Sequence, residues 1–80
     1  MSILNDMTRV AAETKGLEHK MHIQSLRDYI KSRTTREMLG DIRYIYRQDQ
    51  LRVLWEAGLS SELQQAVLRR LEELAARRTE

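Results

Sequence analysis

The turn that decides the fold lies in residues 57–63, AGLSSEL, where a glycine and two serines separate two amphipathic segments. Gly58 can adopt the left-handed backbone conformation that commonly follows the last turn of a helix. Ser60 or Ser61 can then cap the N-terminus of the next helix. The pattern therefore predicts one helix that ends before Gly58 and a final helix over residues 61–76.

The final helix has one apolar and one charged side. Its apolar stripe is expected to bury Leu63, Val67, Leu71 and Leu74. Two helices joined by a glycine turn also suggest a DNA-reading helix-turn-helix. The opposite side of this helix, however, carries three negative charges and one positive charge. Its residues are Glu62, Gln65, Arg69, Glu72 and Glu73. That negative charge argues against entry into a groove lined by phosphates.

The composition of the whole chain is typical of a helical protein. Its 80 residues include no proline and three glycines, while strong helix formers dominate. We therefore expect an all-α fold, a small bundle of four to five helices forming a single domain over residues 1–80. The absence of cysteine excludes a disulfide framework and thiolate chemistry. No apolar run is long enough to cross a membrane and no secretory leader is evident, so we expect a cytoplasmic protein.

A second boundary precedes Thr34. The segment Thr34 to Glu37 fits a capping box, in which a threonine oxygen and a glutamate each bond a free backbone amide. A helix is expected from Thr34 to about Arg47, after which Asp49 could cap a short helix. The expected apolar side of the longer helix is Met38, Leu39, Ile42, Ile45 and Tyr46.

The first third of the chain carries two apolar faces. Residues 3–21 have an apolar row at alternating steps of four and three, which is typical of a helix packed against another helix: Ile3, Met7, Val10, Thr14, Leu17 and Met21. On a continuous helix, Ile23, Leu26 and Ile30 would lie on almost the opposite side from this row. Either the helix breaks around residues 16–22, with Gly16 as a C-terminal cap, or one long helix buries two faces. We favour the break.

Two histidines raise the question of a metal site. Glu18, His19 and His22 share one side of a helical turn, and such side chains can bind zinc. The histidines also lie on the side of Ile23 and Leu26, where a hydrogen-bonded histidine between helices is common. We therefore expect a helical seam and no metal. Because no phosphate-binding glycine loop, nucleophile elbow or metalloprotease motif is present, we expect no enzyme, no cofactor and no small-molecule substrate.

An arginine stripe is the main signal for nucleic acid. On a continuous helix, Arg36, Arg43 and Arg47 would lie on one face, with Tyr44 beside them and Gly40 leaving room for a phosphate. The acidic residues beside this face and a net charge of only +2 weaken the signal. Nucleic-acid binding is therefore the second hypothesis.

Protein association is the first hypothesis, because a chain this short cannot readily bury all its apolar faces. Leu51, Leu54 and Trp55 form a further apolar cluster, which lies either in an interface or in the core. We expect a homo-oligomer or a complex with another protein, without membrane contact. The expected interface residues are Ile3, Met7, Val10, Leu17, Met21, Leu51, Leu54 and Trp55, and the expected nucleic-acid contacts of the second hypothesis are Arg36, Arg43, Tyr44 and Arg47.

Overall fold

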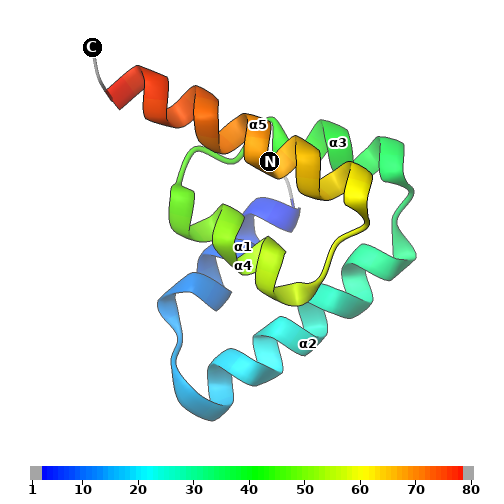
Figure 1. The fold of residues 1–80 in the computed structure, drawn as a ribbon. Helices are drawn as coiled ribbons and strands as arrows, with labels where there is room; N and C mark the ends of the chain where they lie inside the picture. Colours follow the sequence, from blue (N-terminus) through cyan, green and yellow to red (C-terminus); the bar gives the residue numbers. More distant parts are fainter. Residues whose placement is uncertain (1–2, 79–80) are drawn as a thin grey trace.

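The computed structural model describes residues 3–78, which form five α-helices and no strand (Figure 1). This confirms the predicted all-α fold. The helices are α1 (Ile3–Glu13), α2 (Gly16–Ser32), α3 (Thr35–Ile42), α4 (Gln48–Ala57) and α5 (Ser61–Arg78). None of the helices in this part of the chain is long and apolar enough to cross a membrane.

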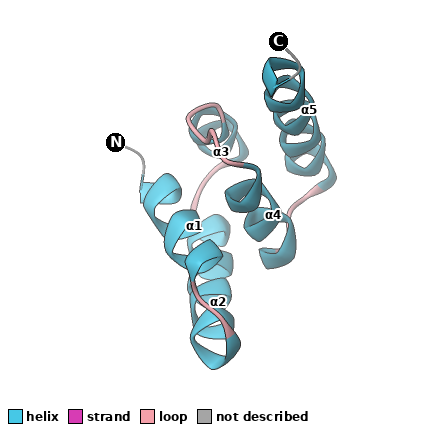
Figure 2. Ribbon diagram, turned by 90° about the vertical axis from the view of Figure 1, so that its left-hand side faces the viewer, coloured by secondary structure: helices cyan, strands magenta, loops and turns pink. Residues whose placement is uncertain are grey.

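The five helices pack in two groups. Helices α1, α2 and α4 contact one another, and α5 lies across α3 and α4 on the side away from α2 (Figures 1 and 2). Helix α1 also touches α3, so α1 and α4 connect the two groups. The whole particle measures 37 × 27 × 24 Å.

One apolar core runs between the helices. Helix α4 contributes most to it, because α4 is packed against α1, α2 and α5. The residues of the final stripe behave largely as predicted, since Leu63, Val67 and Leu74 are buried and Leu71 is half-buried. The buried apolar residues are Leu4, Ala11, Ile23, Leu26, Met38, Ile42, Ile45, Leu51, Val53, Leu54, Ala57, Leu63, Val67 and Leu74.

Glycines mark two of the helix boundaries. The predicted break near Gly16 is confirmed, but Gly16 is the first residue of α2 and not a cap on α1, which ends at Glu13. Its φ of 65° lies in the left-handed region that favours glycine. Gly58, with φ of 101°, follows α4 as predicted. The Ser60 hydroxyl accepts a hydrogen bond from the Leu63 N–H at 3.4 Å, so this serine caps α5.

The predicted capping box at Thr34 is also confirmed. The Glu37 N–H donates to Thr34 Oγ1 at 3.1 Å, and the Thr34 N–H donates to Glu37 Oε1 at 3.0 Å. The hydrogen bonds from Thr34 hold the pKa of Glu37 below its ordinary value of 4.5. These local bonds fix the start of α3 without help from the rest of the fold.

The end of α3 was predicted wrongly. The helix stops at Ile42 and does not continue to Arg47. The Tyr44 and Ile45 amides turn back to bond Asp41 and Ile42 carbonyls, which directs the buried Ile45 inward and leaves Tyr46 exposed. Arg47 is the N-cap of α4. Asp49, expected as that cap, lies in the first turn of the helix.

Candidate functional site

The apolar row of α1 lies largely on the surface. The helix turns Leu4, Thr8 and Ala11 into the core, one position further along the chain than the predicted row. Ile3 and Val10 are consequently exposed, and Met7 is only partly buried against the core. Ile3 and Val10, at the spacing of a packed helix, therefore face outward from α1 and are not covered by another helix among residues 3–78.

The beginning of α2 extends this apolar surface. Leu17 is 75% exposed and Met21 is 62% exposed, and they lie one helical turn apart. Thr14, the polar member of the predicted row, lies in the link between α1 and α2, where its hydroxyl donates to the Ala11 carbonyl at 3.1 Å. The predicted row is thus divided between two helices, with Ile3, Met7 and Val10 on one and Leu17 and Met21 on the other.

Two shallow hollows make this surface continuous. One is lined by Asp6, Met7, Val10 and His22, and the other by Glu18, Met21, His22 and Ser25. Because His22 lines both hollows, they adjoin along the α1–α2 surface. We call this surface, made of Ile3, Met7, Val10, Leu17, Met21 and His22, the α1–α2 face. Sequence reasoning did not assign His22 to it, although His22 follows Met21 directly.

The remaining expected interface residues, Leu51, Leu54 and Trp55, all lie on α4, which turns them to different sides. Leu51 and Leu54 are completely buried in the core of the chain, whereas Trp55 is exposed. A helix with one inward face necessarily divides such neighbours, because successive residues are about 100° apart. Of these three, only Trp55 offers a substantial surface to another molecule.

The arginine stripe does not exist as one helical row. Arg36 lies in the first turns of α3, but Arg43 caps its C-terminus and Tyr44 follows in the turn, both exposed. Arg47 precedes α4 as its N-cap. The prediction failed because it required a helix continuing through Arg47, and the backbone turns away after Ile42. Gly40 has only open space beside its Cα.

Arg47 is occupied by contacts within the chain. Its guanidinium forms an ion pair with Asp49 and a longer one, at 3.5 Å, with Glu13 of α1. The hydrogen bond and charge of Asp49, followed by those of Glu13, raise the pKa of Arg47 further above its ordinary value. A phosphate would have to displace both carboxylates to bind this arginine, which makes it a poor nucleic-acid contact.

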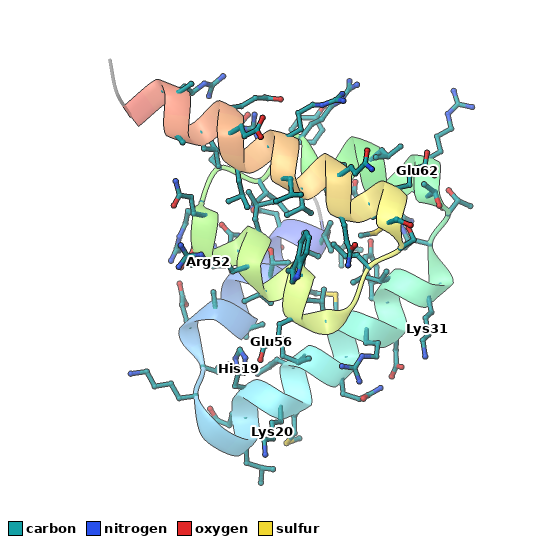
Figure 3. All side chains as sticks on the ribbon, in the orientation of Figure 1. His19, Lys20, Lys31, Arg52, Glu56 and Glu62 are labelled. Carbon is teal, nitrogen blue, oxygen red and sulfur yellow. The ribbon has the colours of Figure 1, made fainter. Side chains whose placement is uncertain are left out.

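His19 joins three helices, as Figure 3 shows for its contact with Glu56. Its Nδ1 lies 2.8 Å from the Ala11 carbonyl oxygen near the end of α1, and its Nε2 lies 2.9 Å from Glu56 Oε2 on α4. Both ring nitrogens face acceptor oxygens, so this geometry suits the protonated ring, which donates from both nitrogens and has no lone pair for a metal. This geometry fits the predicted seam. Within residues 3–78, no group of three or more His, Cys, Asp or Glu side chains is placed to hold a metal ion.

The His19–Glu56 pair predicts a dependence of stability on pH. The hydrogen bond to Glu56, and after it the bond to Ala11, raise the pKa of His19 above 6.5 in the folded chain. Protonation therefore favours folding, and this stabilisation is complete below the unfolded pKa and is lost as pH rises through the folded pKa. We expect the melting temperature of the wild-type chain to fall as pH rises above the ordinary histidine pKa of 6.5.

Glu56→Gln is the variant that tests this pH dependence, because it keeps the shape of the side chain and removes its charge. The fall in melting temperature should shrink in Glu56→Gln and persist in His22→Gln, which changes the other histidine and leaves the pair intact. An equal pH profile in wild-type chain and Glu56→Gln would show that the pair does not contribute.

Comparison of the chain with protein-family models, with curated proteins and with solved structures finds no match.

Proposed function

We propose that this chain is a self-associating helical protein, in which the α1–α2 face packs against the same face of a second copy. The observation that carries the proposal is the exposure of apolar side chains at heptad spacing on α1, continued by Leu17 and Met21 on α2. Large apolar side chains clustered on a surface commonly mark a site of association.

A second copy suits this face because a two-fold contact requires a surface that is complementary to itself. Aliphatic and thioether side chains meet that requirement, and the flexible methionines Met7 and Met21 can adapt their packing to the same residues of a partner. The carboxylate of Asp6 is already paired with Arg9 at 3.4 Å. Bringing two copies together therefore does not place an isolated charge at this edge of the contact.

The size of the chain is consistent with this arrangement. A stable interface covers about 800 Å² on each partner, a modest part of the 5632 Å² exposed by the chain. Proteins below about 80 residues also commonly gain stability by associating, because their cores are small. By contrast, the interrupted arginine row supplies no continuous basic surface, so nucleic-acid binding is not the function that we propose.

The double variant Val10→Asp, Met21→Asp tests the proposal. Each carboxylate would be buried in the contact without a partner, so we expect the dimer dissociation constant to rise by about a hundredfold or more. Both positions are exposed in the single chain, so its helices should persist. The measurement is sedimentation equilibrium over a range of concentrations, with circular dichroism to confirm that the variant is folded.

Leu68→Asp is the matched control. Leu68 is 48% exposed, comparable with Val10 at 37%, but it lies on α5, which packs on α3 and α4. This variant should keep the mass of the wild-type dimer. A wild-type chain that remains monomeric at high concentration would refute the proposal, and so would a folded double variant that keeps the dimer mass.

A further inference from the structure

A second surface lies between α3 and α5, on the opposite group of helices from the α1–α2 face. It is a hollow of about 550 Å³. Leu39 and Ile42 from α3 and Ala66 from α5 form its apolar lining. The acidic side chain that lines the hollow, Glu73, is paired with Arg70, so an apolar group could be accommodated against this lining.

Basic side chains surround this apolar lining. Arg43 approaches from the end of α3, and Arg69 and Arg70 approach from α5, against a single carboxylate from Glu73. Glu73 is bonded to Arg70 at 3.0 Å. Neither Arg43 nor Arg69 forms an ion pair with another residue in the described part of the chain, so both guanidinium groups can pair with a ligand.

Arg70 is held rigidly in place. Its side chain is 9% exposed, and its Nε donates to the Ile45 carbonyl oxygen at 2.9 Å. The guanidinium also lies over the ring of Tyr46, 4.9 Å from the ring centre. These contacts and the bond to Glu73 engage Nε and Nη1, whereas Nη2 has no partner among the described residues. A fixed guanidinium whose Nη2 N–H groups are unpaired can donate them to a carboxylate with little loss of side-chain entropy.

We propose that this hollow binds an acidic peptide segment that carries an apolar anchor residue. The carboxylates would pair with Arg43, Arg69 and the Nη2 of Arg70, and the anchor would contact Leu39 and Ile42. Charge complementarity with an apolar centre is the chemistry that such a peptide offers.

A phosphate backbone fits this surface less well. It has no apolar group to place against the lining of the hollow, and its charge continues along the strand. The exposed side of α5 carries Glu62 and Glu72 in addition to Glu73, which would repel a long polyanion lying along this helix. A peptide can instead concentrate its acidic side chains beside the three arginines.

The probe for this proposal is a fluorescein-labelled peptide rich in aspartate and glutamate, with two leucines one helical turn apart. Anisotropy titration with the full chain should give saturable binding that weakens with added salt. The Arg43→Ala, Arg69→Ala double variant should bind about tenfold or more weakly. A peptide with serines in place of both leucines should lose a similar factor, because it lacks the anchor.

A second double variant, Lys31→Ala, Arg52→Ala, controls for net charge. It removes two exposed basic residues, on α2 and α4, that are labelled in Figure 3 and do not line the hollow, and it should bind the peptide like the wild-type chain. Equal weakening in both double variants, or no saturable binding by the folded wild-type chain, would overturn the proposal. So would a labelled DNA duplex that binds through Arg43 and Arg69 while the peptide does not.

Discussion

Leu54→Ala should lower the free energy of unfolding by about 2 to 5 kcal/mol, which is the usual cost of truncating a fully buried leucine. Leu54 has no exposed surface and lies on α4, the helix packed against α1, α2 and α5. The cavity left by the lost side chain would therefore lie in the core against α4 and could not collapse without moving the helices packed on it. Urea denaturation followed by circular dichroism measures the loss, at one fixed protein concentration because association adds to apparent stability.

The adjacent residue provides the control for this prediction. Trp55→Ala removes a larger side chain, but one that is exposed, so we expect a smaller loss of stability than in Leu54→Ala. Comparing the two variants shows whether Leu54 stabilises the core of the chain or an interface with another molecule. Should Leu54→Ala leave the unfolding free energy unchanged and instead reduce the mass of the assembly, Leu54 would belong to an interface.

Helix boundaries were predictable wherever the residues that fix them are close in sequence. The capping box joins Thr34 to Glu37 within one turn, and Gly58 supplies a backbone conformation that few other residues adopt. Such local interactions fix a helix boundary independently of how the rest of the chain packs. The end of α3 was different, because the Ile45 carbonyl oxygen is bonded by Arg70 from another helix. No local pattern around Ile45 reveals a partner that lies 25 residues further along the chain.

The inward face of α1 could not be predicted for the same reason. The row Ile3, Met7 and Val10 is at least as apolar as Leu4, Thr8 and Ala11, so periodicity alone does not reveal which of the two rows enters the core of the chain. Thr8 is tolerated in the core because its hydroxyl donates to the Leu4 carbonyl and accepts from Gln50 of α4. That polar partner comes from a distant helix and decides which face is buried.

One residue of the α3–α5 hollow did carry a signal in the sequence. Arg70 stands at the heptad spacing of the buried stripe, between Val67 and Leu74, where an apolar residue is the usual choice. An arginine there must find partners inside the fold. Arg43 and Arg69 gave no comparable signal, because their proximity depends on how α3 and α5 pack.

The buried contact between α1 and α4 gives the second large prediction. Gln50 is 3% exposed, and its Nε2 donates to the Asn5 carbonyl oxygen, to Asn5 Oδ1 and to Thr8 Oγ1 at 2.8 to 3.0 Å. Gln50→Glu replaces this donor with an oxygen of nearly the same shape. The introduced carboxylate would face acceptor oxygens without a basic partner in this network, and we expect a loss of about 3 kcal/mol at neutral pH.

The loss of folding stability in Gln50→Glu should become smaller as pH falls. Burial among acceptors raises the pKa of the introduced carboxyl above the unfolded value of about 4.3. The destabilisation is therefore complete above the folded pKa and is relieved as pH falls toward about 4, where the protonated acid can again donate one hydrogen bond. Urea denaturation of Gln50→Glu and wild-type chain at several pH values measures this difference, with Gln65→Glu on the exposed side of α5 as the control. A difference that stays constant with pH would mean that the introduced carboxylate escapes to solvent, and that Gln50 holds α1 to α4 by its shape and not by its donor.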